Sequence, residues 1–356
     1  MSRTVSEASA PSTVSPTRRR VAIPARGILL ANVALILVAL VFLDVNVFDQ
    51  ASTSTLTPVL GVMILIAMGQ AFVIGTGGID LSIPATVTLV GVVLIKVSEG
   101  TNAKLPQAIV VCLALCLLIG FVNGFLVEIL HLNALVVTLA TGQLIAGLTR
   151  MYRGPVPSVS AVPERLSKLV RESVINISLV LVLAVVVCIL AALWLRFHVT
   201  GRTVSASSVA RAAADYSGLH ATRQRIVAWM VGSFIVAIGS ILLAGQITTP
   251  DLTLGDPYLM TSIVAVVLGG ASIAGGRVRV AGTLLGAVFI IVLDFIFRVR
   301  GLSSGLSLAV QGAVLAVGLS LAVTGQSNVR WLTLFTRRQG TTGSSLDSAH
   351  HKESQE

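Results

Sequence analysis

Charged side chains are scarce in this sequence. Only 11% of its 356 residues are Asp, Glu, Lys or Arg, whereas a soluble domain carries roughly 25%. Hydrophobic residues make up 54% of the chain, and its mean hydropathy is +0.92. No polar stretch between residues 27 and 324 is long enough for a separate soluble domain. The composition therefore excludes an ordinary soluble protein and indicates an all-α integral membrane protein.

The residue patterns of enzymes are also missing. The chain has no Gly-x-x-x-x-Gly-Lys-Ser/Thr phosphate-binding loop and no Gly-Lys pair at all, so it lacks the usual machinery for ATP hydrolysis. The histidines form no nucleophile–base pair and no metal spacing, and His350 and His351 lie in the C-terminal tail. Cys112, Cys116 and Cys188 lie within apolar runs and are interpreted as packing residues. We predict no enzyme activity, no catalytic residue, no metal site and no cofactor of its own.

Few acidic residues lie within the apolar segments. The candidates are Asp80, Glu128 and Asp294, and the last two lie near segment ends. A carrier driven by protons or sodium ions usually keeps several ionisable groups inside the membrane. We therefore expect the energy for any active transport to come from a partner protein. A stand-alone secondary carrier for a small polar solute is the alternative.

Apolar segments, by contrast, dominate the chain. Hydropathy predicts about ten transmembrane helices. Their approximate ranges are 27–43, 56–74, 83–97, 108–130, 134–152, 174–197, 226–247, 259–274, 280–297 and 306–324. Together they form one predicted transmembrane permease domain, residues 27–324. The second to fifth and the seventh to tenth spans would enter the membrane from opposite sides, which suggests two inverted repeats.

Basic residues outnumber acidic ones by 25 to 15, which gives a formal net charge of +10. They are scattered at segment ends rather than gathered on one face, so nucleic-acid binding is not expected. Residues 1–26 are predicted to be a disordered, basic cytoplasmic tail before an uncleaved signal anchor, and residues 325–356 a polar cytoplasmic tail. The N-terminal arginines are interpreted as a topology signal, and a site for anionic membrane lipids is the alternative.

One apolar run is interrupted by the stretch GTGGIDLSIPA, residues 75–85. Its notable residues are Gly77, Gly78, Asp80, Ser82 and Pro84. In one interpretation, Ser82 or Asp80 caps the helix that Pro84 begins. In the other, the interrupted segment lines a translocation pathway, where non-helical backbone can be satisfied by water or protein. Both interpretations can hold at once.

Other polar and small residues lie inside apolar spans. Gln70 and Asn123 are interpreted as partners in interhelical hydrogen bonds, with pathway lining as the alternative. A group of glycines is expected to allow close helix approach and a turn, with direct ligand contact as the lesser interpretation. These glycines are Gly269, Gly270, Gly275, Gly276, Gly282 and Gly286.

The longest predicted cytoplasmic loop, residues 196–225, contains the stretch SSVARAAADYSGL. We predict a short helix here, which Ser208 caps at its start and Ser217-Gly218 ends. Arg211 and Asp215 would then lie one turn apart on its surface. Without further information this is an ordinary surface helix or an attachment point for a partner.

Three separated stretches resemble the membrane-spanning permeases of ribose- and other monosaccharide-type ABC importers. Residues 59–85, ending GQAFVIGTGGIDLSIPA, are similar to the family signature G-Q/M-T-x-V-I-x-x-G-G-I-D-L-S-V-G-S. Residues 261–293 are similar to A-I-A-A-V-V-L-G-G-T-S-L-x-G-G-x-G-x-x-x-G-T-L-x-G-A. The loop 196–225 lies in the place of the family's loop G-R-x-x-x-A-x-G-x-N-x-x-A-A-x-x-x-G-I. The resemblance covers about residues 40–324.

The resemblance implies a multi-pass subunit of the bacterial plasma (inner) membrane with both termini in the cytoplasm. In such importers two permease copies, identical or different, join two ABC ATPase subunits that use the ATP. An extracytoplasmic solute-binding protein delivers a monosaccharide or related polyhydroxylated solute. The loop helix, with Arg211, Ala212, Ala213, Asp215 and Gly218, would dock into the ATPase. Because aromatic residues make up only 5% of the chain, a pathway of modest affinity is expected.

The chain departs from the family pattern at two informative places. Pro84 follows Asp-Leu-Ser-Ile where the family has glycine, which predicts a stiffer start of the next helix. Family members often carry an acidic residue before the paired alanines of the loop and a basic one after them, whereas here Arg211 comes before and Asp215 after. One hypothesis is an ATPase partner with compensating charges. The particular substrate stays open.

Overall fold

The structure is a computed structural model that describes residues 25–154, 162–247, 251–303, 305–313 and 316. All of these residues belong to one compact unit, residues 22–322. The predicted tails lie outside the described residues, except that the helix Ala25–Val41 already includes the last two residues of the N-terminal tail. Much of the last predicted span also lies outside them.

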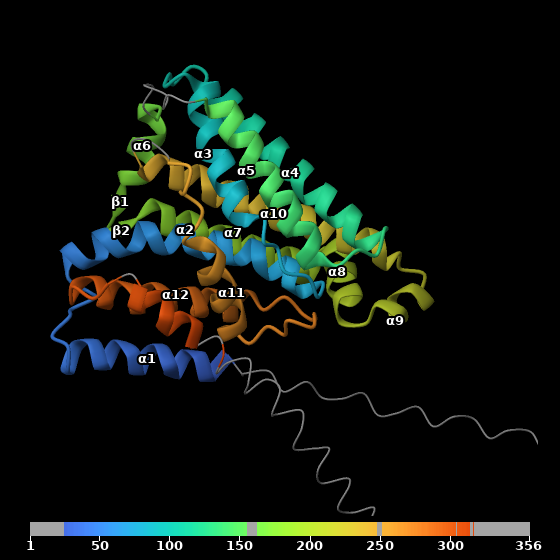
Figure 1. Ribbon diagram of the computed structural model, residues 1–356. Coiled ribbons are helices and arrows are strands. Elements are labelled where there is room, and N and C mark those ends of the chain that lie inside the picture. The colour runs from blue at the N-terminus through green and yellow to red at the C-terminus, as the bar shows by residue number, and fades with distance from the viewer. Residues whose placement is uncertain (1–24, 155–161, 248–250, 304, 314–315, 317–356) are drawn as a thin grey trace, which may run out of the picture. The chain divides into compact units, whose positions relative to one another are not determined.

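The described chain is mostly helical (Figure 1). Its helices are α1 (Ala25–Val41), α2 (Gln50–Gly75), α3 (Ile83–Ser98), α4 (Leu105–Glu128), α5 (Ala134–Arg153), α6 (Glu164–Arg171), α7 (Leu179–Phe197), α8 (Val199–Val209), α9 (Arg211–Tyr216), α10 (Ala221–Gln246), α11 (Tyr258–Leu268) and α12 (Val280–Val299). Residues 305–313 are also helical. The strands β1 (Ser173–Val174) and β2 (Ile177–Ser178) form a short antiparallel hairpin.

Six of the described helices are long and apolar enough to cross a membrane: α2, α4, α5, α7, α10 and α12. Helices α1, α3 and α11 are apolar but shorter, and α11 has only 11 residues. The prediction of an all-α membrane fold is confirmed by these helices. The count of ten spans and the inverted repeat stay predictions.

Two predicted spans have different ends in the structure. The sixth was expected to start earlier than Leu179, where α7 begins, but the preceding residues form the β1–β2 hairpin. Ile175 and Asn176 at its turn have φ values of 52° and 62°, which a tight hairpin requires. The eighth span was expected to continue beyond Leu268, but Gly270 follows with a φ of 83° and ends the helix.

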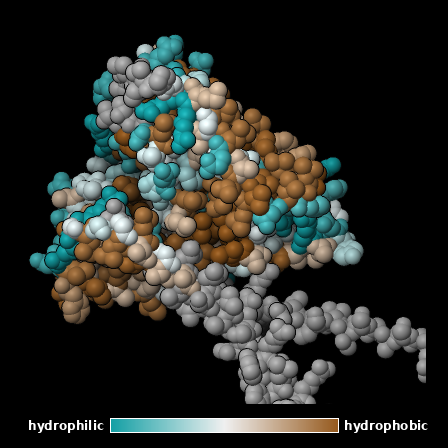
Figure 2. Space-filling view, viewed as in Figure 1, coloured by the Kyte–Doolittle hydropathy of each residue, from teal (hydrophilic) through white to brown (hydrophobic). Residues whose placement is uncertain are grey.

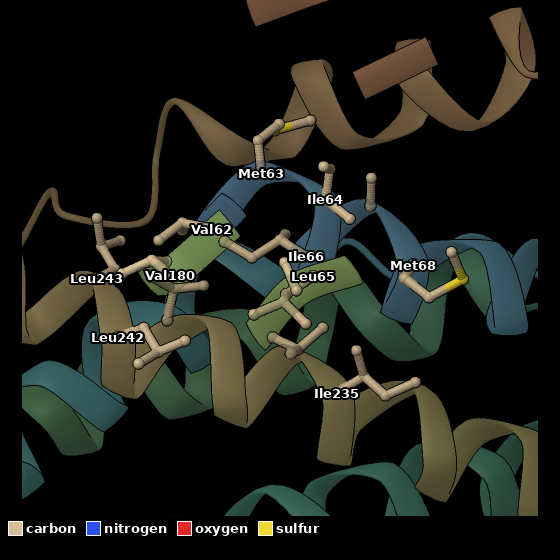
Figure 3. Packing of buried hydrophobic residues seen from close by; sticks show 14 of the residues in the cluster. Val62, Met63, Ile64, Leu65, Ile66, Met68, Val180, Ile235, Leu242 and Leu243 are labelled. Atoms are coloured by element: carbon tan, nitrogen blue, oxygen red, sulfur yellow. The ribbon is translucent and has the colours of Figure 1, made fainter. Parts of the chain in front are cut away.

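Helix α2 lies at the centre of the packing. It contacts α7, α10, α11 and α12, and every residue from Leu60 to Gly75 is buried. Figure 3 shows its side chains among those of the neighbouring helices, including Val180 of α7 and Leu242 of α10. A helix that is apolar on every face is expected inside a bundle rather than at its surface.

The close packing around α2 depends on glycines of this helix that face the backbones of neighbouring helices. A Cβ atom on Gly69 of α2 would lie 2.5 Å from the carbonyl oxygen of Gly232 in α10. On the α7 side, a Cβ on Gly61 would lie 2.7 Å from the Val180 carbonyl carbon. Small residues let helices approach in a membrane, where burial against lipid provides no hydrophobic driving force.

The structure also places the glycines that were predicted to serve helix packing. Gly269 at the end of α11 lies against Gly282 of α12, and a Cβ on Gly269 would lie 2.5 Å from the Gly282 carbonyl oxygen. Gly286 of α12 faces the Ala265 backbone of α11. Gly276 donates its N–H to the carbonyl of the last α2 residue at 2.9 Å. These contacts join backbone to backbone.

Apolar side chains cover the outer faces of several helices. Leu118 of α4, Leu144 of α5 and Leu190 of α7 are each more than half exposed. Figure 2 shows apolar surface over α4 and α5. Such a surface suits contact with lipid or with another apolar surface rather than with water. With the six membrane-length helices, it defines a multi-pass membrane protein.

We predict that Gly69→Ala lowers the free energy of unfolding by about 1–3 kcal/mol, the range typical of an overpacked core. The new methyl group would collide with the Gly232 carbonyl. Gly147→Ala in α5 is the matched control, because nothing lies within 4 Å of a Cβ there. Thermal unfolding in detergent measures both variants. Equal stability of the two would contradict the close approach of α2 and α10.

Candidate functional site

The chain leaves helical geometry between α2 and α3, over residues 76–82, here called the helix break. Gly77 donates its N–H to the Ile74 carbonyl at 2.9 Å. Gly78 donates to the Val73 carbonyl at 3.3 Å. This is the Schellman arrangement, and the φ of 88° at Gly77 favours glycine. The Val73 and Ile74 carbonyls of α2 are thus satisfied by residues that directly follow the helix, whereas the Gly75 carbonyl accepts from Gly276.

Asp80 organises the second half of the helix break. Asp80 is only 4% exposed, and its Oδ1 accepts hydrogen bonds from the Ser82 N–H at 2.8 Å and the Ser82 hydroxyl at 2.5 Å. Asn123 of α4 donates to the same hydroxyl at 3.2 Å. Thr138 of α5 donates to the Ile79 carbonyl at 3.1 Å. The break is therefore positioned by its own carboxylate and by two neighbouring helices.

The predicted cap at the start of α3 is present, but the hydrogen bonds that form it differ from those of a direct side-chain cap. Ser82 is the N-cap residue of α3, and Pro84 lies in the first turn as predicted, but the Ser82 side chain makes no capping hydrogen bond. Its hydroxyl donates to Asp80 instead. Asp80 accepts the backbone N–H two residues on, which is an Asx turn. The local turn takes the place of a direct cap.

Several buried polar atoms on α2, α4 and α10 have no hydrogen-bond partner among the described residues. They include both side-chain polar atoms of Gln70, Oδ1 of Asn123 and Nε1 of Trp229. An unpaired buried group costs about 1–3 kcal/mol, so these atoms suit contact with water or a polar solute. Asn123 does form a hydrogen bond to another segment, because it donates to Ser82. Gln70 forms no such bond among the described residues.

A cavity of about 380 Å³, here called the break cavity, adjoins the helix break. It is lined by the start of α3, by α5 and by the loop before α11. Its polar lining residues are Thr88, Gln143, Thr149, Arg150, Thr253 and Asp256. Small-molecule sites commonly measure about 300–1,000 Å³. Of the predicted break residues, Pro84 lines this cavity, whereas Gly77, Gly78, Asp80 and Ser82 do not.

Sequence reasoning named none of these six polar residues as site residues. The sequence pattern could have identified Gln143 and Arg150, because these two polar residues lie two turns apart on one face of the mostly apolar α5. No local pattern could identify Asp256. Its place depends on a loop that packs against α3, where Gly255 donates its N–H to the Thr88 hydroxyl at 3.1 Å.

The predicted helix of the long loop consists of two helices, α8 and α9. Ser208 was expected to cap the start, but it is buried within α8. The chain turns at Ala210, which has extended geometry and precedes α9. The predicted end is confirmed, because α9 stops at Tyr216 and Gly218 follows with a φ of 75°.

The predicted surface pair of Arg211 and Asp215 does not form. The Arg211 side chain reaches Glu128 at the end of α4, with Nη1 3.3 Å from Oε2. The Asp215 Oδ1 accepts the Ala221 N–H at 2.9 Å, at the start of α10. Both side chains therefore contact neighbouring helices, because those offer a buried carboxylate and a free helix-terminal amide.

Glu128 also forms an ion pair with a second arginine. Arg225 of α10 places Nε 2.7 Å from Glu128 Oε2 and also donates Nη2 to the Thr76 carbonyl, the first residue of the helix break. We call Glu128, Arg211 and Arg225 the charge cluster. It connects α4, α9 and α10 with the break.

The outer face of α9 takes no part in these ion pairs and hydrogen bonds. Ala212 and Ala213 are exposed, and Tyr216 is 93% exposed. Beside this helix lies a cavity of about 1030 Å³ lined by α8, α9, the end of α7 and the segment before α12. Arg196, Arg202 and Arg277 are among its lining residues.

A bundle of membrane-length helices around an interrupted helix, with a polar cavity at the interruption, defines a polytopic membrane transport protein. Residues 52–319 match the family described as branched-chain amino acid transport system / permease component, and the chain belongs to this family. It is a permease component of a transport system.

Curated relatives are similar over most of their length. The ribose import permease protein RbsC of Bacillus subtilis (strain 168) is 31% identical over 264 residues, which are 72% of this chain and 80% of the relative. The autoinducer 2 import system permease protein LsrD of Escherichia coli (strain K12) is 28% identical over 276 residues, 75% of this chain and 83% of the relative. The predicted resemblance to ribose-type permeases is confirmed. No solved structure matches the chain.

We predict that Asp80→Asn assembles normally, because the amide keeps an oxygen that can accept from Ser82. Asp80→Ala removes the acceptor of both hydrogen bonds and should lower the free energy of unfolding by about 1–3 kcal/mol. Thermal unfolding of the two purified variants checks this difference. If both variants lose stability equally, the charge of Asp80 rather than its acceptor oxygen maintains the break. If Asp80→Asn assembles but loses transport, the carboxylate serves the pathway.

Proposed function

We propose that this chain is the permease subunit of an ABC importer and forms the translocation pathway for a monosaccharide or related small polyhydroxylated solute. The observation that carries the proposal is α9, a short helix with an exposed outer face that is connected by buried charges to the helix break. Two relatives whose names specify import of ribose and of autoinducer 2 support the direction and the solute class.

The proposal includes ten spans in two inverted repeats. Helices α2 and α10 each have 26 residues, and the next helix along the chain in each case is a shorter apolar one, α3 or α11. This likeness supports the repeat. The described helix at 305–313 would begin the tenth span. The chain would lie in the bacterial inner membrane with both termini in the cytoplasm, as the basic N-terminal residues favour.

The proposed partners are an ABC ATPase, an extracytoplasmic solute-binding protein and a second permease copy. The ATPase would hydrolyse the ATP, so the permease needs no cofactor and no catalytic group. Ala212, Ala213 and Tyr216 offer the ATPase an exposed surface on α9. Tyrosine is enriched at the centres of protein interfaces, because a large ring is buried at low entropic cost.

The break cavity would be part of the solute pathway. Its amide, hydroxyl, carboxylate and guanidinium groups can hydrogen-bond the hydroxyls of a sugar. None of its lining residues is aromatic. A cavity without aromatic faces for stacking supports the modest affinity expected of a pathway, with selectivity in the binding protein.

Transport in proteoliposomes tests the proposal. Uptake should require ATP, the ATPase and the loaded binding protein, and a panel of pentoses, hexoses and polyols identifies the solute. The alternative, a secondary carrier, predicts uptake by the permease alone along an ion gradient. Uptake without the ATPase would therefore overturn the proposal.

We predict that Tyr216→Ala weakens binding to the ATPase by about 2 kcal/mol, the size of an interface hot spot. Co-purification from detergent and ATP-driven uptake measure the loss. Ile175→Ala is the matched control, since Ile175 is 89% exposed but lies in the β1–β2 turn. Equal complex formation by both variants would contradict docking through Tyr216.

A further inference from the structure

Glu128 is a buried carboxylate at an unfavourable position. Its side chain is 1% exposed and belongs to the last residue of α4. The C-terminus of a helix carries partial negative charge, so a carboxylate there is repelled unless cations balance it. Arg211 and Arg225 both reach the same oxygen, Oε2. The charge cluster therefore exists because three helices bring these groups together.

One side of the cluster fixes α9. Besides its ion pair, Arg211 donates Nη2 to the Glu128 carbonyl at 3.4 Å and to the Thr222 hydroxyl at 3.0 Å. Asp215 accepts the Ala221 N–H. The inner side of α9 is thus bonded to the ends of α4 and α10, while its outer face is exposed at the edge of the bundle (Figure 1).

The other side of the cluster reaches the helix break. Arg225, whose side chain is 15% exposed, connects Glu128 to the Thr76 carbonyl at the start of the break. Asn123, on the same helix as Glu128, donates to Ser82 at the end of the break. The last turns of α4 therefore contact the end of the break directly and its start through Arg225.

We propose that Glu128, Arg211 and Arg225 are positioning residues that transmit a displacement of α9 to the helix break. The inference rests on the proposed function, in which an ATPase displaces α9. It also changes the interpretation of the reversed charges in the loop. Arg211 and Asp215 have their partners within the chain, so the ATPase needs no compensating charges at these positions.

Arg211→Gln is the decisive variant. The Arg211 side chain is 34% exposed, and Glu128 keeps its closer partner Arg225 when Arg211 is replaced, so the fold should survive. Arg211→Lys keeps the charge and should restore much of the connection. Arg223→Gln is the matched control, because Arg223 lies in the same region with an exposed side chain.

The position of α9 can be measured in the full chain in nanodiscs without any partner. A spin label on Tyr216→Cys reports its mobility, and the native cysteines are buried and should stay unlabelled. Arg211→Gln and Glu128→Gln should each raise the ratio of mobile to immobile label about tenfold, as expected for loss of a charge-assisted hydrogen bond. The double variant should equal the single ones. Unchanged mobility in Arg211→Gln, or additive effects, would overturn the proposal.

Coupling is measured in proteoliposomes with the ATPase and the loaded binding protein. Arg211→Gln should still bind the ATPase and hydrolyse ATP, but solute transported per ATP should fall about tenfold, and Arg211→Lys should recover it. Loss of ATPase binding would make Arg211 a docking charge and overturn the inference, as would normal coupling. If the wild-type chain shows no ATP-driven uptake, the proposed function fails, while the label experiment still tests the connection.

Discussion

A helix that stops inside an apolar bundle leaves polar backbone groups that lipid cannot hydrogen-bond. The helix break between α2 and α3 satisfies this constraint partly with its own residues and partly with donors from other segments of the fold. Gly77 and Gly78 donate back into α2, and Asp80 accepts from Ser82. The Gly75 and Thr76 carbonyls accept from distant donors, the Gly276 N–H and the Arg225 guanidinium. Asn123 of α4 and Thr138 of α5 also hydrogen-bond the break and hold these helices against it.

The break lies at the end of α2, the most deeply buried of the six described membrane-length helices. Gly61 and Gly69 let α7 and α10 approach the α2 backbone, whereas the outer faces of α4, α5 and α7 keep their apolar side chains exposed. A close-packed centre transmits displacements rather than absorbing them, because interiors have few voids and low compressibility. A polar cavity beside such a centre can respond to small movements of the surrounding helices.

The charge cluster has a different physical role from the glycine contacts. A buried ion pair adds little net stability, because desolvation offsets most of the attraction, yet it is directional and loses much when one partner is removed. Glu128 contacts two helices through one oxygen atom and the break through Arg225. Such directional contacts can connect the exposed helix α9 with the buried backbone of the helix break.

The order of residues alone was enough to predict the membrane class, the helix break with Pro84 at the start of α3, and the end of α9 at Gly218. These features depend on composition and on neighbours within a turn. The tertiary structure decided the partners of Arg211 and Glu128, which lie 83 residues apart in the chain. It also split the loop helix at Ala210 and placed a loop against α3. The reason is physical: a charged side chain chooses among all groups that the fold brings near, and local spacing describes only those on its own helix.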